Sequence, residues 1–288
     1  MKLFVIAHTG QLGKELCALI NQDDYSLCSF SREQLDITNH EKVRSEILHC
    51  RPDIVINTAA HHATIEGEQN PGKLFAINSF SLKNLAMTCR QLHAKLVTFS
   101  SDYVYDGRLG RAYREDDIPH PIQYFGLSKY IGEIIARNYN PDTIIIRTSG
   151  VYGGEGSQSK RNFVLNLLNE SKTNKLIDVS SEQIVSPTFA HDLATATMAL
   201  LRHPKATPGI YHLTNTGYCS WAEFSDEILH LMKSNASVRP VDRRGESGGI
   251  RRPLFSALEN TKAKVLGIVL PDWKEALKRY IDYLSTRA

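Results

Sequence analysis

The first half of the chain alternates short apolar runs with longer segments whose apolar residues recur at helical spacing. The short runs are unbroken rather than alternating, which is typical of strands in a parallel sheet that is covered on both faces. The pattern predicts strands at residues 3–6, 25–30, 53–57, 95–100 and 143–147, and helices at 14–20, 41–48, 74–93 and 129–137. This alternation favours an α/β fold with a doubly wound parallel sheet.

Beyond residue 150 the pattern is mixed. It predicts helices at 162–170, 191–202, 221–232 and 273–284, and a strand at 176–179. Two stretches rich in glycine and polar residues, 153–161 and 239–252, are predicted to be loops, the first of them mobile. We therefore expect one domain over residues 1–150, a later segment near 185–215 that packs back onto it, and a smaller C-terminal lobe over 151–288.

Composition narrows the class of protein. Hydrophobic residues make up 42% and charged residues 23% of the 288 residues, which excludes a disordered, collagen-like or coiled-coil chain. The net charge of +3 is too balanced to predict binding to nucleic acid or to a membrane surface. No apolar run approaches the ~20 residues that span a bilayer, and the apolar start is too short for a signal peptide. We expect a cytoplasmic protein.

The cysteines predict neither a disulfide nor a metal site. There are five, an odd number, at wide spacing and without a CxxC motif. We expect five reduced thiols. His61, His62, Glu66 and Glu68 lie near one another in the sequence, but their spacing fits no known metal site, so no metal is expected.

A glycine turn follows the first strand and opens a helix, in the sequence Ala7-His8-Thr9-Gly10-Gln11-Leu12-Gly13. A dinucleotide-binding turn needs glycines so that the backbone can approach a pyrophosphate, which then lies on the helix N-terminus. Gly10 and Gly13 have the required spacing, and Ala7 replaces the first glycine. The alternative is a plain strand–helix turn.

The residues that would meet the adenosine ribose come about 20 residues after the glycine turn, at the end of the second strand. An acid there favours NAD, whereas an arginine accommodates the 2′-phosphate of NADP. Ser31 and Arg32 occupy this place, which favours NADP. A solvated surface charge is the alternative for Arg32.

Two further groups carry candidate chemistry. Ser101 and Asp102 follow the fourth strand, at the sheet edge where ligands bind, and a hydroxyl there can donate to a reacting carbonyl. Capping of the strand end is the alternative. Phe125 and Lys129 are one helical turn apart. Short-chain reductases place at this spacing a tyrosine that protonates the carbonyl and a lysine that lowers the tyrosine's pKa.

Taken together, these motifs resemble those of the dTDP-4-dehydrorhamnose reductases, in the extended branch of the short-chain dehydrogenases/reductases. The resemblance covers nearly the whole chain. Its motifs are TGQLG (9–13), LDIT (35–38), NTAA (57–60), SSDYVYDG (100–107), YRED (113–116), YFGLSK (124–129), RTSGVYG (147–153), VSPT (185–188), GIYHLTN (209–215), SWAEF (220–224) and RPLFSALEN (252–260).

The resemblance implies a Rossmann domain over residues 1–150 that binds NADP(H), with NAD(H) as the alternative, and a lobe over 151–288 that binds a dTDP-sugar. It also implies roles for individual residues. Gly10, Gln11 and Leu12 would contact the pyrophosphate, and Gly13 would permit close helix packing; Ser31 and Arg32 would lie at the adenosine ribose, and Asp36 and Ile37 at the adenine; Ala59, Ala60 and His61 would follow the cofactor; Lys129 would bind the nicotinamide ribose, Ser101 would polarise the substrate carbonyl, and Asp102 would lie beside it.

Three positions depart from the family pattern. Phe125 stands where the family has its catalytic tyrosine, so the usual general acid is absent, and Tyr124 is rotated about 100° away along the helix. Gly150 stands where many relatives carry a tryptophan that packs on the sugar, which predicts a wider substrate pocket. His61 replaces a tyrosine and is expected to be a spacer near the cofactor.

The sequence therefore predicts a reductase of a dTDP-4-keto-6-deoxy sugar that is impaired by Phe125. Three alternatives remain open. One is a catalytically silent, NADP-binding regulatory subunit, such as the β subunit of methionine adenosyltransferase, which resembles this family. Another is an engineered Tyr-to-Phe variant of an active reductase. The third is a sugar-nucleotide epimerase or dehydratase, against which Phe125 counts equally. A homodimer is possible on the sequence.

Overall fold

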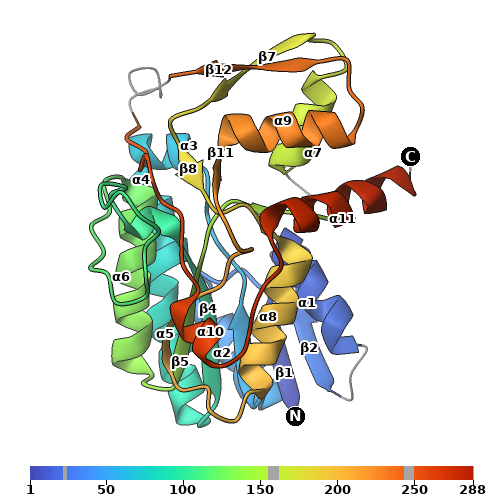
Figure 1. Cartoon of the computed structure of the whole chain (residues 1–288). Helices are drawn as coiled ribbons and strands as arrows, with labels where there is room; N and C mark the ends of the chain where they lie inside the picture. Colours follow the sequence, from blue (N-terminus) through green and yellow to red (C-terminus); the bar gives the residue numbers. More distant parts are fainter. Residues whose placement is uncertain (22–24, 155–161, 243–249, 288) are drawn as a thin grey trace.

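A six-stranded sheet forms the centre of the computed structural model, which describes residues 1–21, 25–154, 162–242 and 250–287 (Figure 1). Its strands are β1 (Lys2–Ile6), β2 (Ser26–Phe30), β3 (Ile54–Asn57), β4 (Lys95–Ser101), β5 (Thr143–Thr148) and β10 (Gly209–His212). They are all parallel, in the order β2-β1-β3-β4-β5-β10. The order reverses between β1 and β3, and ligands of such sheets bind outside the carboxyl ends of the strands at this reversal.

Helices cover both faces of the sheet (Figure 1). They are α1 (Gln11–Asn21), α2 (His40–Cys50), α3 (Thr64–Gln69), α4 (Pro71–Phe75), the π-helical η1 (Ala76–Phe80), α5 (Ser81–Gln91), the 3₁₀ turn η2 (Asp102–Val104), α6 (Tyr124–Tyr139), α8 (Ala190–Arg202) and α10 (Thr261–Val265). Leu3 and Val5 of β1 pack in one core with residues of α1 and α8, whereas Phe4 and Ile6 pack in a second core with residues of α2 and α5. The strand is apolar throughout because both of its faces are buried.

A second, smaller group of elements lies beyond the carboxyl edge of the sheet, at the top of Figure 1. It comprises β6 (Val151–Tyr152), α7 (Phe163–Glu170), β7 (Leu176–Ser180), β8 (Ile184–Val185), β9 (Thr188–Phe189), β11 (Cys219–Ser220), α9 (Trp221–Leu231), β12 (Ser237–Val241) and α11 (Trp273–Ser285). Its core is aromatic and includes Tyr152, Phe224, Trp273 and Tyr280. The N-terminus of α9 is fixed by a capping box between Ser220 and Glu223.

The helix predicted over 74–93 is composite. α4, η1 and α5 follow one another without a break from Pro71 to Gln91, and the π-helical turn between them shifts the register. α6 packs tightly against this turn, since a Cβ on Gly132 would lie 2.2 Å from the carbonyl oxygen of Asn78. Apolar spacing does not reveal a π-helical turn because it adds one residue without ending the helix.

One loop prediction differs in part from the structure. Residues 239–241, predicted as loop, belong to β12, which pairs in parallel with β7. The Arg239 guanidinium and the Asp178 carboxylate pair across these strands, at 2.6 and 2.7 Å, which explains why a charged stretch is extended here. The predicted loop segments 155–161 and 243–249 lie outside the described residues.

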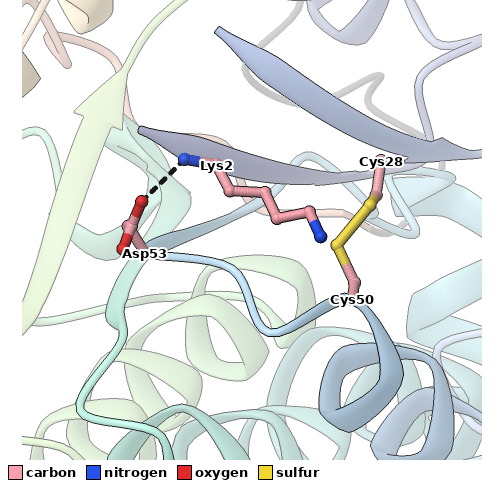
Figure 2. Close-up of a disulfide and its surroundings, with 4 residues drawn as sticks. All are labelled: Lys2, Cys28, Cys50 and Asp53. Carbon is pink, nitrogen blue, oxygen red and sulfur yellow. Dashed lines mark hydrogen bonds between the residues drawn. A yellow bond between two sulfur atoms is a disulfide. The ribbon is translucent and has the colours of Figure 1, made fainter.

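The prediction of five reduced thiols is wrong for two of the cysteines, because Cys28 and Cys50 form a disulfide (Figure 2). Cys28 lies in β2 and Cys50 is the last residue of α2. After α2 the chain returns to the start of β1, where the Lys2 N–H donates to the Asp53 carboxylate at 2.6 Å. Because β1 pairs with β2, this crossover brings the two cysteines together although 22 residues separate them.

Candidate functional site

The predicted site residues follow different strands, and the parallel sheet gathers them at its carboxyl edge. Backbone and side-chain hydrogen bonds join the loops after β1, β2 and β3. The His8 N–H donates to the carbonyl of Phe30, at 3.1 Å, and the Thr58 hydroxyl donates to the carbonyls of Ile6 and Ala7, at 2.7 and 3.2 Å. The glycine turn therefore adjoins both the turn after β2, which contains Ser31 and Arg32, and the segment that contains Ala59, Ala60 and His61.

The glycine turn is as tight as the sequence predicts. The Gly10 N–H donates to the carbonyl of Ala7 at 3.0 Å, and a Cβ on Gly13 would lie 2.5 Å from the same oxygen. Ala7 itself is left-handed, with φ of 63°, the conformation that a glycine would adopt more easily. The Lys14 N–H bonds back to Gly10, and the N–H groups at a helix start face outward, where they favour an anion.

Gln11 contributes to the site in a second way. Its backbone begins α1, as predicted for a pyrophosphate contact, but its side-chain amide donates to the carbonyl of Gly153, at 3.2 Å. The side chain thus ties the start of α1 to the segment after β6. Leu12, the next residue, is half-buried and packs against the core that α1 shares with α8.

The turn after β2 leaves Arg32 exposed and Ser31 buried. The Ser31 hydroxyl accepts from the Gln34 N–H at 3.3 Å, so it holds the turn. Glu33, which the sequence reasoning overlooked, has a pKa lowered mainly by a hydrogen bond from Ser31 and to a lesser degree by the Arg32 charge. An ionised carboxylate therefore lies beside the cation that would meet a 2′-phosphate.

Asp36 and Ile37, predicted to lie at the adenine, differ in their surroundings. Asp36 is exposed, and its carboxylate accepts from the backbone and hydroxyl of Thr38, which lowers its pKa. Ile37 is 5% exposed and belongs to the core with Leu35 and Val43. Ile37 can therefore support a bound adenine only indirectly, by anchoring the turn that would contact it.

Asn78, on η1, fixes the segment after β3. Its side-chain oxygen accepts from the His61 N–H and its amide donates to the His61 carbonyl, both at 2.9 Å. The same amide donates to the Ser128 hydroxyl on α6, at 3.0 Å. Ala59 is held by its N–H, which donates to Asn57, at 3.1 Å, whereas Ala60 is exposed. One buried amide thus links the segment after β3 to α6.

Asp102 is enclosed by three hydroxyls. Its carboxylate accepts from Ser101 at 2.8 Å, from Ser149 at 2.9 Å and from Ser256 at 2.6 Å. Burial raises the pKa of Asp102, and the three hydrogen bonds oppose this rise. A carboxylate can only accept, so the Ser101 hydroxyl must be the donor in their bond. Asp102 therefore joins the ends of β4 and β5 to the segment that carries Ser256.

Phe125 and Lys129 lie on the inner face of α6, which begins at Tyr124 after the cap residue Gln123. Phe125 is 9% exposed, and its ring is in edge-to-face contact with the Tyr103 ring, with centroids 5.9 Å apart. The Lys129 ammonium donates to the carbonyl of Phe99 at 3.0 Å. Burial lowers the pKa of Lys129 to about 8, although the Glu133 carboxylate opposes this shift.

A polar cavity of about 10 Å³, room for roughly one water, lies between α6 and the sheet. Its polar lining comes from Asn57, Asn78, Thr98, Ser100, Lys129 and Glu133. The Ser100 hydroxyl is buried here without a hydrogen-bond partner within the described residues. A buried hydroxyl of this kind is suited to bind a ligand or a water.

Gly150 lies at the end of β5 with φ of 54°. A Cβ there would lie 3.5 Å from the indole of Trp221 and 3.2 Å from Pro187. The sequence reasoning predicts that the absent tryptophan widens the pocket, and it overlooked Trp221, whose ring borders this position from the smaller lobe.

The described parts of the chain hold no cluster of three or more His, Cys, Asp or Glu side chains that could bind a metal ion. Nor does any helix among these residues have the length and apolar character needed to cross a membrane. Lys129, serine hydroxyls, tyrosines and backbone N–H groups are the polar groups that the described site presents.

The chain matches the family described as the RmlD substrate binding domain over residues 1–286. It is 34% identical to a dTDP-4-dehydrorhamnose reductase of Streptomyces griseus, over 99% of this chain and 94% of that protein. This chain belongs to the dTDP-4-dehydrorhamnose reductase family. It is also 36% identical to the spore coat polysaccharide biosynthesis protein SpsK of Bacillus subtilis, over 99% of this chain and 98% of that protein.

A solved member of the dTDP-4-dehydrorhamnose reductase family has the same fold. It is the reductase of Bacillus anthracis in complex with NADP, which has a TM-score of 0.92 and 32% identity over 98% of this chain and 99% of that one. The predicted family and the predicted α/β fold are thus confirmed. The roles of individual residues stay predictions, and so does the absence of the family's tyrosine at Phe125.

Proposed function

We propose that this protein reduces the 4-keto group of dTDP-4-dehydrorhamnose, or of a related dTDP-4-keto-6-deoxy sugar, with NADPH. The observation that carries the proposal is the position of Lys129. Its ammonium donates to the carbonyl of Phe99, near the carboxyl end of β4 and two residues before Ser101. The chain is similar over its full length to dTDP-4-dehydrorhamnose reductases. A carbonyl bound at this edge would meet both a cation and a hydroxyl.

The residues present fit a dinucleotide. The tight turn at Gly10 and Gly13 brings backbone N–H groups to the edge, where they would bind the pyrophosphate. Lys129 would bind the nicotinamide ribose, because its ammonium has three hydrogens and only one bond, to Phe99, within the described residues. When bound, NADPH supplies the hydride.

We further propose that Phe125 slows this reaction. A phenyl ring has no proton to donate, and loss of a positioned general acid usually costs a factor of ~10²–10⁴ in rate. The cofactor residues and Lys129 are intact, so hydride positioning should survive. The chain is then a slow reductase rather than an inactive one.

The test is NADPH oxidation with dTDP-4-dehydrorhamnose, measured for the unaltered chain and for Phe125→Tyr. We expect slow turnover by the unaltered chain and at least a tenfold higher kcat for the variant, with little change in NADPH affinity. If neither protein oxidises NADPH above the rate without sugar, the reductase proposal is wrong.

Phe125 also supports a second candidate, a silent regulatory subunit that binds NADP without turnover. The two candidates differ in the same assay. A silent subunit would bind NADPH in calorimetry, but Phe125→Tyr would not restore sugar reduction, because its pocket would not have been kept for a sugar.

A further inference from the structure

If Phe125 cannot protonate the reduced carbonyl, another group must do so. Ser101 is the hydroxyl that the family resemblance places at the carbonyl, but its hydrogen is directed to the Asp102 carboxylate, at 2.8 Å. Its oxygen accepts from the Tyr103 N–H at 3.2 Å. Donation to a carbonyl would break the bond to a buried carboxylate, which makes Ser101 a poor sole proton donor.

Two of the neighbouring tyrosines are also unsuited. The Tyr105 hydroxyl is fully buried and is bonded to Arg147 at 2.7 Å, to His212 at 3.0 Å and to the carbonyl of Arg114 at 3.0 Å. Tyr124 is 40% exposed, and its ring packs edge-on against Phe75, with centroids 6.2 Å apart. It therefore lies on a different side of α6 from Phe125.

Tyr103 is the tyrosine that contacts Phe125. Its ring meets the Phe125 ring edge to face, at 5.9 Å between centroids. Its backbone is held against α6, because any Cβ on Gly126 would collide with the Tyr103 carbonyl. Tyr103 is half-buried, so part of the residue reaches solvent.

The Tyr103 hydroxyl is also available. Within the described residues it has no hydrogen-bond partner. Burial and the Asp102 charge raise the pKa of Tyr103 to about 12, although the Arg252 charge opposes the rise. The phenol is therefore protonated at neutral pH and can donate to the strongly basic oxygen that hydride transfer creates.

We propose that Tyr103 is the proton donor of this chain, in place of the residue at position 125. This inference rests on the proposed function. In the step, a C–H bond would form between the carbonyl carbon and a hydride supplied by NADPH, whose own bond to that hydride breaks, and the C=O π pair moves onto the oxygen. That oxygen takes the proton of the Tyr103 hydroxyl, whose O–H bond breaks. The resulting phenolate regains a proton from water.

The test compares kcat and KM for Tyr103→Phe and for the matched control Tyr124→Phe with dTDP-4-dehydrorhamnose and NADPH. Tyr103→Phe should lower kcat at least tenfold, whereas Tyr124→Phe should leave it unchanged. In the Phe125→Tyr background, Tyr103→Phe should lower kcat less than threefold, because a second donor is present. Calorimetry should show unchanged NADPH affinity in every variant.

A second readout follows the proton itself. A ring-fluorinated tyrosine at position 103 is a stronger acid than tyrosine, so it should raise kcat at neutral pH, where Lys129, with a pKa of about 8, is still charged. If kcat does not change, or if Tyr103→Phe keeps the kcat of the unaltered chain, Tyr103 is not the donor although the reductase function stands. If only proteins with Phe125→Tyr reduce the sugar, the inference is also overturned. If no protein does, it is the proposed function that has failed.

Discussion

At the level of single residues, the side chains that hold the site together are polar groups that bond to partners far along the chain. Asn78 reaches His61 and Ser128, which are 17 and 50 residues away, and Ser256 bonds to Asp102 across 154 residues. No local pattern signals such contacts. Lys129 and the glycines could be predicted, because their chemistry or backbone demands one residue type at one spacing.

Arg32 should determine cofactor preference. It is exposed at the end of β2, and a guanidinium there would pair with a 2′-phosphate. Arg32→Ala should weaken NADPH binding about tenfold, as expected for a lost charge-assisted hydrogen bond, and should leave NADH binding nearly unchanged. Calorimetry at low ionic strength measures both affinities.

The control for this change is Arg90→Ala, an exposed arginine at the end of α5. It should alter neither affinity. Equal weakening of NADPH and NADH binding by Arg32→Ala would instead show that the Arg32 charge does not distinguish the 2′-phosphate.

At the level of elements, periodicity predicted the strands of the first half because both faces of the sheet are apolar. It missed elements whose stability comes from distant partners. β10 was not predicted as a strand, yet it pairs with β5. β12 was missed because most of its residues are exposed and it pairs with β7, which is about 60 residues earlier in the chain.

His212, on β10, should make stability depend on pH. It is fully buried, and burial together with the Arg147 charge lowers its pKa to about 3. The unfolded chain, with a histidine pKa of about 6.5, binds more protons below that pH. The stabilisation is thus complete above pH 6.5 and is lost as pH falls toward 3, by about 2 kcal/mol at pH 5.

Urea unfolding between pH 7.5 and 5 measures this slope. His212→Gln should flatten it, whereas His49→Gln, which changes an exposed histidine on α2, should not. An unchanged slope in His212→Gln would show that carboxylates, not His212, cause the loss of stability.

At the level of the whole molecule, the chain passes repeatedly between the sheet and the smaller lobe. After β5 it forms β6 and α7, returns as α8 and β10, leaves as α9 and returns as α10. An ion pair between Arg279 of α11 and Asp192 of α8, at 2.7 Å, joins the lobe to the sheet. The amino-acid composition does not change where the chain crosses between the sheet and the smaller lobe. The division of the chain into two domains at residue 150 therefore stays a prediction.

The disulfide should stabilise this whole fold. It closes a loop of 22 residues, for which the loss of unfolded-state entropy corresponds to about 3 kcal/mol. A reducing agent should therefore lower the free energy of unfolding of the unaltered chain by about this amount. The same agent should leave Cys28→Ser unaffected. Stability insensitive to reductant, with five free thiols by mass spectrometry, would contradict the pairing of Cys28 with Cys50.

The proposed function requires that a hydride pass from NADPH to the 4-keto carbon of a dTDP-sugar at the edge where Lys129 and Ser101 lie. The most direct measurement is mass spectrometry and proton NMR of the product formed from dTDP-4-dehydrorhamnose with NADPH deuterated at the transferable position, catalysed by the unaltered chain and by Phe125→Tyr. We predict one deuteron on the sugar, at C4, formed slowly by the first protein and faster by the second. A sugar recovered without deuterium from both proteins would contradict the proposed hydride transfer.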